Sequence, residues 1–307
     1  MQLTVLTNTV ITMLLLILCG FGAAKIGIID KTASKKLSAL IINIGQPFLM
    51  VSSLLESEFS IDNLKLGLFI VLLAAGIHTI TIAISLISTV GIKNINERQI
   101  TRFSMVFANN AFYGYPILRA VFGAKGVFWG SFYCVFFNIL LWTWGMFVLS
   151  RANRSIRMSP VKIFLNLGTL SVSLGLIYYV TRMPVIQPMR SAMEYLGGLC
   201  TPITMLICGA AISRIPLKQL FLKPLTYYMC LAKLVVAPLL IGTLATLLGL
   251  GRDMTLFAAL MAGMPTAANT SAFAEQYDIV PEYASCCVGL STVLSVITVP
   301  MTVLVFG

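Results

Sequence analysis

Two polar interruptions of apolar segments hold the residues best suited to binding chemistry. The first runs from Asn109 to Pro116 and the second from Gly263 to Asn269. Glycine and proline break a helix at such positions, which leaves backbone N–H and C=O groups without partners. An unpaired polar group in apolar surroundings is costly, so a substrate that pairs with these groups would be bound there. Gly114 and Gly263 are expected to supply backbone torsions that other residues resist.

Asparagine side chains can complete such a site without a permanent charge, because the amide both donates and accepts hydrogen bonds. The helix N-termini that follow the interruptions favour an anionic group. We therefore predict that the substrate is bound by Asn109, Asn110, Tyr113, Gly114, Pro116, Pro265, Thr266 and Asn269, together with Lys233 from another segment. Contacts from the opposite side of the site are expected from Asn43, Gln46, Thr201 and Thr204.

Lys233 and His78 are ionisable residues inside apolar segments, which makes them functional candidates. Lys233 either attracts a carboxylate or extends its ammonium group to the inner membrane surface, and the sequence leaves both interpretations open. For His78, a structural hydrogen bond is the favoured interpretation. The seven cysteines lie in apolar segments without metal-ligand spacing, so we interpret them as small hydrophobic residues and expect neither a metal nor a cofactor.

The segments that carry these residues are interpreted as membrane spans. Hydrophobic residues make up 58% of the chain, charged residues make up 10%, and the mean hydropathy is +0.95. Such a composition excludes a soluble globular protein. About 20 apolar residues are enough to cross a bilayer as a helix. We predict ten spans, at 5–26, 33–55, 64–90, 98–121, 124–150, 160–181, 188–212, 224–249, 253–276 and 281–305.

The two halves of the chain resemble each other at a constant offset. Arg98, Thr101, Phe103, Ala108 and Ser131 recur 154 positions later as Arg252, Thr255, Phe257, Ala262 and Ser285. Five spans per half is an odd number, so the second half would enter the membrane upside down relative to the first. The predicted fold is an all-α polytopic membrane protein. It has ten transmembrane helices in two inverted five-helix repeats, residues 1–152 and 153–307, and helices 4 and 9 are broken and cross each other.

Lysine and arginine in the loops predict the orientation of the chain. The loops after the first, third, fifth and seventh spans are the richest in these residues, which predicts that they are cytoplasmic. Both termini are then expected on the extracytoplasmic side of the cell membrane. The net charge of +11 is mostly this orientation signal, and no nucleic-acid partner is expected.

The interruptions and the residues near them resemble the auxin efflux carrier family. The resemblance rests on residues 108–116, 122–126 and 265–269, with Tyr277-Asp278, Pro281-Glu282 and Ala284-Ser285. It implies a fold similar to sodium/proton antiporters and bile-acid symporters. Helices 1, 2, 6 and 7 would form a scaffold, while helices 3–5 and 8–10 would form a transport domain that carries an organic anion by an elevator mechanism. The short loop between spans five and six differs from that of the plant PIN carriers, which favours a bacterial-type member and argues against auxin as the substrate.

The predicted function is secondary transport of a small organic anion, such as a mono- or dicarboxylate. The alternative is a sodium- or proton-coupled symporter or antiporter of the same fold, which would need ion-coordinating acids that the interruptions lack. An intramembrane enzyme is disfavoured because no paired aspartates or serine–histidine pair is present. The sequence leaves open the transport direction, the coupling and the formation of a homodimer. A smooth apolar seam is expected between the scaffold and the transport domain, from Ala39, Ile41, Ile42, Ile44, Gly45, Gly197, Gly198, Ile203 and Ile207.

Overall fold

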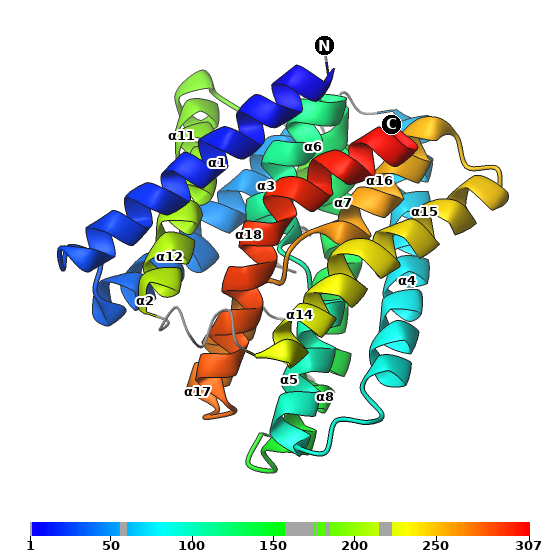
Figure 1. The fold of residues 1–307 in the computed structure, drawn as a ribbon. Helices are drawn as coiled ribbons and strands as arrows, with labels where there is room; N and C mark the ends of the chain where they lie inside the picture. Colours follow the sequence, from blue (N-terminus) through cyan, green and yellow to red (C-terminus); the bar gives the residue numbers. More distant parts are fainter. Residues whose placement is uncertain (1, 56–59, 157–174, 176, 182–184, 215–222) are drawn as a thin grey trace.

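The structure is a computed structural model that describes residues 2–55, 60–156, 175, 177–181, 185–214 and 223–307 (Figure 1). Helices form all the regular structure of these ranges apart from one isolated bridge between Ala108 and Thr266. The predicted span at 160–181 falls mostly outside the described residues. Both ends of the chain lie at the same end of the molecule.

The helices follow the predicted spans, with several of them divided by a short turn. The first half contains α1 (Gln2–Lys25), α2 (Lys31–Leu40), η1 (Ile41–Gly45), α3 (Gln46–Leu55), α4 (Ile61–Ser88), α5 (Ile95–Val106), η2 (Asn110–Gly114), α6 (Tyr115–Phe122), α7 (Ala124–Leu140), η3 (Leu141–Gly145) and α8 (Met146–Ala152). The second half contains α11 (Gln187–Gly198), α12 (Cys200–Arg214), α14 (Pro224–Leu231), η4 (Ala232–Val236), α15 (Ala237–Leu247), α16 (Arg252–Gly263), α17 (Asn269–Gln276) and α18 (Pro281–Phe306).

The elements η1 to η4 are single π-helical turns: η1, η3 and η4 lie inside longer helices, and η2 is the first turn of the helix that continues as α6. Turns of this kind are rare in proteins overall, and those that occur are often found at functional sites. Three of the four contain a residue predicted to bind substrate or to face it: Asn43 in η1, Asn110 in η2 and Lys233 in η4. These turns could not be predicted, because a π turn depends on packing between helices rather than on a local residue pattern.

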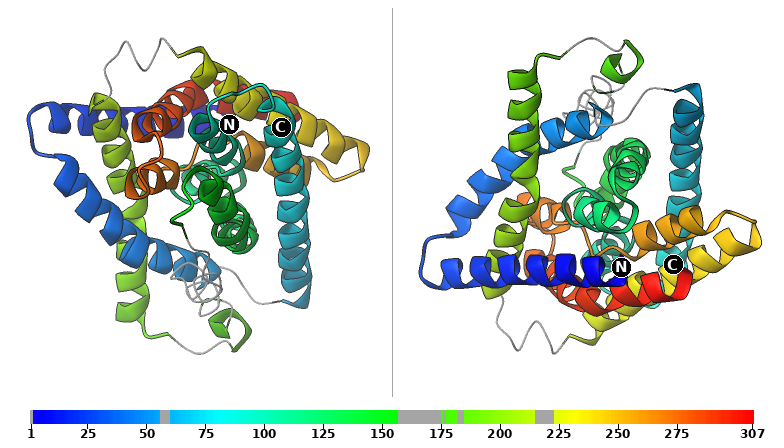
Figure 2. Two further views of the ribbon diagram at one scale, coloured as in Figure 1. Left: turned by 90° about the horizontal axis from the view of Figure 1, so that it is seen from below. Right: turned by 90° about the horizontal axis from the view of Figure 1, so that it is seen from above.

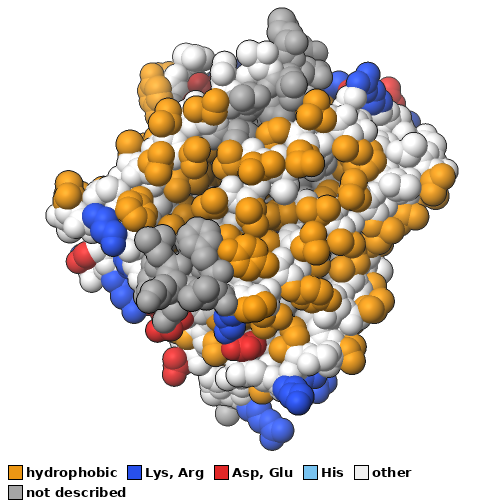
Figure 3. Space-filling model, viewed as in Figure 1, with side chains coloured by type: hydrophobic (Ala, Val, Ile, Leu, Met, Phe, Trp, Pro, Cys, Tyr) orange, Lys and Arg blue, Asp and Glu red, His pale blue; other side chains and the backbone are white. Residues whose placement is uncertain are grey.

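Five helical segments in the described ranges are long and apolar enough to span a membrane. They are Ile61–Ser88, Ala124–Ala152, Gln187–Arg214, Pro224–Leu247 and Pro281–Phe306, and a shorter apolar stretch lies at Ile11–Lys25. Large apolar side chains cover much of the face shown in Figure 3, while charged side chains gather toward its edges. This surface suits contact with lipid. The regular structure of the described residues is therefore helical apart from the one bridge, with several segments that can span a membrane, and the total of ten spans stays a prediction.

The helices surround a centre formed by α6 and α7. Figure 2 shows α11 and α12 on one side of this centre and α4 on the other. The pair α1 and α12 packs most closely, at Gly20 and Gly209. A Cβ atom on Gly209 would meet the backbone of Ile17, and one on Gly20 would meet the backbone of Leu206. Small residues allow such close approach between helices in a membrane.

A side chain at this contact is expected to destabilise the protein. Gly209→Val should lower the melting temperature by roughly 5–10 °C, because the helices must separate or shift to admit the new atoms. Thermal unfolding of the detergent-solubilised protein measures the effect. Gly22→Val on α1 is the matched control, since a Cβ at Gly22 meets nothing within 4 Å. Equal melting temperatures for the two variants would contradict the predicted contact.

Candidate functional site

Both predicted interruptions are present, and they meet each other. α5 ends at Val106 and η2 begins at Asn110, while α16 ends at Gly263 and α17 begins at Asn269. Met264 is extended (φ −64°, ψ 148°), as expected for a residue that precedes a proline. The Asn109 backbone N–H donates to the Pro265 carbonyl oxygen at 2.7 Å, and the Ala267 N–H donates to the Phe107 carbonyl oxygen at 3.0 Å. We call this meeting point, residues 107–110 and 264–269, the crossing.

Much of the backbone at the crossing is paired within the protein. The Thr266 hydroxyl donates to the Ser104 carbonyl oxygen at 3.2 Å, and the Thr266 N–H donates to the Ser291 hydroxyl at 3.0 Å. The Lys233 ammonium donates to the Met105 carbonyl oxygen at 2.9 Å. The expectation that a substrate must satisfy these backbone groups is therefore wrong, because the two interruptions and nearby side chains satisfy them.

The unsatisfied polar groups of the crossing are side chains. Asn110 is 1% exposed, and neither atom of its amide makes a hydrogen bond of good geometry within the described residues, although the Tyr133 hydroxyl lies close to it. The buried amide nitrogen of Asn109 also has no hydrogen-bond partner there, and outside the crossing the same holds for the buried hydroxyl groups of Thr270, next to Asn269, and of Thr204 on α12. Buried polar groups are nearly always hydrogen-bonded, so exceptions of this kind mark a place where a ligand or an ordered water can bind.

Other residues predicted for the site, at the crossing or next to it, differ in burial and in hydrogen bonding. Asn269 is half-buried at the first turn of α17. Tyr113 is buried, and its hydroxyl accepts a hydrogen bond from Ser295 Oγ at 2.9 Å. Gly114 has ordinary helical torsion angles (φ −69°, ψ −45°), and Gly263 is not among the glycines with positive φ. The predicted need for unusual glycine torsions is therefore wrong at both positions.

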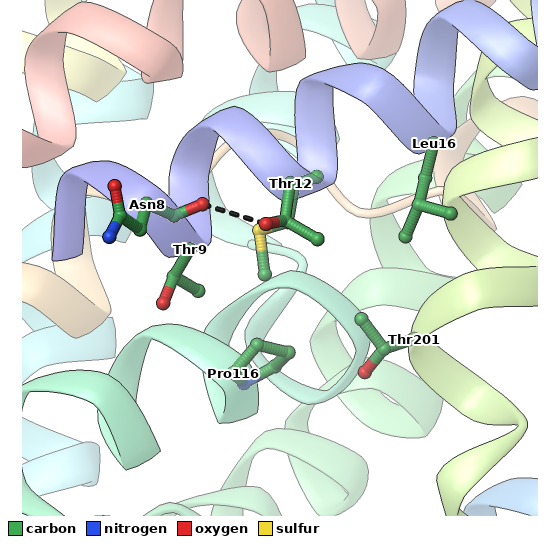
Figure 4. Close-up of a pocket in the computed structure, with 7 residues that line it drawn as sticks. Asn8, Thr9, Thr12, Leu16, Pro116 and Thr201 are labelled. Atoms are coloured by element: carbon green, nitrogen blue, oxygen red, sulfur yellow. Dashed lines mark hydrogen bonds between the residues drawn. The ribbon is translucent and has the colours of Figure 1, made fainter. Parts of the chain in front are cut away.

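An open pocket of about 330 Å³ lies between α1, α6 and α12 (Figure 4), and it reaches the helix that follows the crossing at Pro116. A cavity of this size suits a small organic molecule. Figure 4 shows Thr12 and Leu16 of α1 above Pro116 of α6 and Thr201 of α12. The complete lining is Asn8, Thr9, Thr12, Met13, Leu16, Pro116 and Thr201.

The lining of this pocket contains two predicted residues, Pro116 and Thr201. It also contains three polar residues of α1 that were not predicted: Asn8, Thr9 and Thr12. Asn8 and Thr12 are four residues apart, which places them on one face of a helix, and the Thr12 hydroxyl donates to the Asn8 carbonyl oxygen at 2.8 Å. A polar pair at this spacing inside the first apolar span was the signal that could have identified them.

The residues predicted to face the crossing are spread over two segments. Thr204 is buried on α12, and Thr201 is half-buried on the same helix. Asn43 is exposed in η1. Gln46 begins α3, but its side chain lies outside the described part of the structure. Thr201 and Thr204 are thus the better placed of the four.

An apolar cluster joins η1, η2 and α12. Its buried members are Ile41 of η1, Phe112 of η2 and Cys200 of α12, and Leu49, Ala111 and Ile203 pack against them. Ile41 and Ile203 are two of the residues predicted for an apolar seam. We call this group the seam cluster. It contains no charged side chain, so it suits a surface along which helices slide.

Lys233 is 1% exposed, and its ammonium group is directed at the end of α5. The interpretation that it extends to the membrane surface is therefore wrong. His78 is also 1% exposed. Its Nδ1 lies 2.8 Å from the Ala74 carbonyl oxygen and 3.4 Å from the Tyr133 hydroxyl, in agreement with a structural hydrogen bond. No group of three or more histidine, cysteine or acidic residues in the described ranges could hold a metal ion.

Comparison with known proteins identifies the family. Residues 5–303 match the family model described as membrane transport protein. The chain belongs to this family. The match confirms the resemblance to auxin efflux carriers. A protein of Methanothermobacter thermautotrophicus (strain Delta H), described as an uncharacterized transporter, is 25% identical over 311 residues, which cover 96% of each chain. The family is one of transporters rather than enzymes, and its apolar helices make this member a multi-pass membrane protein.

Proposed function

We propose that this member of the membrane transport protein family is a secondary transporter of a small organic anion. The observation that carries the proposal is the crossing itself. Two interrupted helices meet there, and the buried Asn109 and Asn110 amides have donors and acceptors that make no hydrogen bond of good geometry among the described residues. Paired interrupted helices are typical of substrate sites in secondary transporters.

The charge distribution favours an anion. The N-termini of α6 and α17 follow the two interruptions, and the partial positive charge of a helix N-terminus attracts negative groups. Lys233 adds a positive charge near the same point. The ion pair on α17 itself, Lys31–Glu275, lies at the C-terminal end of that helix, and the pairs Lys223–Glu97 and Lys125–Asp253 also lie at helix ends. A mono- or dicarboxylate also fits the volume of the neighbouring cavity.

We further propose that the protein works by an elevator mechanism within two inverted five-helix repeats, residues 1–152 and 153–307. Helices α1 to α3, α11 and α12 would belong to the scaffold, and α4 to α8 with α14 to α18 would belong to the transport domain. The seam cluster supports this division because it offers an apolar contact between the two groups. Lys31 of α2 and Glu275 of α17, 2.6 Å apart, join them by an exposed ion pair that is easily broken.

The position of the chain ends supports the predicted even number of spans. Both ends lie at one end of the molecule (Figure 1), as an even number of spans requires. The loop charges then favour a cell-membrane protein with both termini on the extracytoplasmic side. We include a homodimer in the proposal, because the exposed apolar surface has room for a second copy of the chain.

Binding of the proposed substrates can be tested without a transport assay. A carboxylate bound at about 100 times its Kd should raise the melting temperature of the purified protein by roughly 5 °C. We expect such a shift with at least one small carboxylate and with none of the corresponding primary amines. A shift produced by the amines alone would contradict an anion site.

The threonines of the cavity are expected to set the affinity. Thr201→Val removes a hydroxyl from the cavity and keeps the shape of the side chain, so KM should rise roughly fivefold to tenfold. Thr246→Val, at an exposed position of α15, is the matched control and should leave KM unchanged. Uptake into proteoliposomes measures both variants. An unchanged KM in Thr201→Val would show that the substrate does not use this cavity.

A further inference from the structure

Lys233 is a buried cation without an acidic partner in the described part of the chain. It lies in η4, is 1% exposed, and donates to a backbone carbonyl oxygen, that of Met105. The ion pairs of the described residues involve lysines and arginines at helix ends, such as Lys223 and Lys125. The other titratable groups that act on Lys233 are Cys230 of α14 and His78 of α4, and neither is an acid that would pair with it.

Burying an ammonium group is costly, and a lysine side chain is long enough to reach a membrane surface instead. The position that Lys233 occupies offsets part of this cost. Met105 belongs to the last turn of α5, and the C-terminal end of a helix carries a partial negative charge. In transporters with interrupted helices, carbonyl groups at such ends coordinate the coupling cation. In this protein the Lys233 ammonium group already donates a hydrogen bond to a carbonyl oxygen of this kind, that of Met105.

We propose that Lys233 is a built-in cation that replaces a coupling ion. This inference rests on the proposed transport of an organic anion. When a monocarboxylate is bound at the crossing, the charge of Lys233 balances it, so the loaded transport domain crosses the membrane without net charge. The carrier then needs no sodium ion to move its substrate. The contact of Lys233 with α5 gives it an electrostatic role beside the substrate rather than a direct hydrogen bond to it.

Exchange of substrate across a membrane potential tests the inference. Proteoliposomes would be loaded with the monocarboxylate that is best transported among acetate, lactate, pyruvate and phenylacetate, and exchange of its radiolabelled form would be measured. Only the loaded carrier moves during exchange. We expect the wild-type rate to be the same at zero potential and at about 100 mV, and to be the same in sodium and choline buffers.

Lys233→Met should change this behaviour. The loaded carrier would then move one uncompensated negative charge, and about 100 mV should slow exchange by up to roughly tenfold. Lys223→Met removes a lysine from the partly exposed end of the same helix, and its exchange should stay insensitive to voltage. A structural role for Lys233 would lower the amount of active protein without creating voltage dependence.

The outcomes separate this inference from the proposed function. Wild-type exchange that requires sodium, or that depends on voltage as strongly as the Lys233→Met variant, would overturn the built-in cation and leave anion transport intact. The sodium comparison uses the wild-type protein alone, so it decides the point even where Lys233→Met does not fold. Absence of exchange with every carboxylate would overturn the proposed function and this inference with it.

Discussion

Replacing Asn110 with alanine is expected to abolish transport while leaving the protein folded. The buried amide makes no hydrogen bond of good geometry among the described residues, so its removal should lower the melting temperature by only the few degrees that a small cavity costs. If the amide binds the substrate, its loss should reduce uptake of a radiolabelled organic acid by about 100-fold or more. Asn269→Ala, on the other side of the crossing, should have a similar effect on uptake.

The matched control for these variants is Gln276→Ala. It also removes a side-chain amide, but from an exposed position at the last residue of α17. Its uptake should equal that of the wild type. Full activity of both Asn110→Ala and Asn269→Ala would remove the crossing from the mechanism.

A disulfide across the seam cluster is expected to stop turnover reversibly. Ala111 of η2 and the native Cys200 of α12 belong to this cluster, so Ala111→Cys places two thiols on opposite sides of the proposed sliding surface. Oxidation should lower uptake by roughly 20-fold or more because the transport domain can no longer move, and reduction should restore it. The exposed Cys19 would first be replaced with serine to prevent side reactions.

A second disulfide within the scaffold controls for oxidation itself. Ile17→Cys is the variant to use, on the closely packed pair α1 and α12, because the Ile17 backbone lies against Gly209, which follows the native Cys208 in the chain. Both helices belong to the proposed scaffold, so this link should leave uptake unchanged. An oxidised Ala111→Cys protein that transports at its normal rate would show that the two groups of helices need not slide past each other.

The interruptions could be predicted because proline and glycine act locally. Pro265 restricts Met264 to an extended conformation in any environment, so the end of α16 follows from the sequence. The hydrogen bonds between the interruptions could not be predicted in the same way. They depend on how α5 and α16 approach each other, and the sequence therefore suggested unpaired backbone where the structure has Asn109 paired with Pro265.

Side-chain positions that depend on contacts between helices could not be predicted either. Lys233 was identified as an unusual intramembrane charge, but its direction depends on the π turn of η4 and on the nearby end of α5. The contribution of α1 to the cavity was missed because Asn8 and Thr12 are weak signals in an apolar span. The domain division and the substrate-binding residues stay predictions, because they concern motion and ligands. The repeat organisation stays a prediction because most of the predicted span at 160–181 lies outside the described residues.

Uptake of a panel of radiolabelled substrates by proteoliposomes tests the central claim, that the crossing transports a small organic anion. The panel should contain mono- and dicarboxylates, primary amines and neutral sugars, with wild-type protein compared with Asn110→Ala. We predict saturable uptake of at least one carboxylate, competition by the same unlabelled acid, and loss of this uptake in the variant. Uptake confined to amines or sugars, or equal carboxylate uptake by both proteins, would contradict the claim.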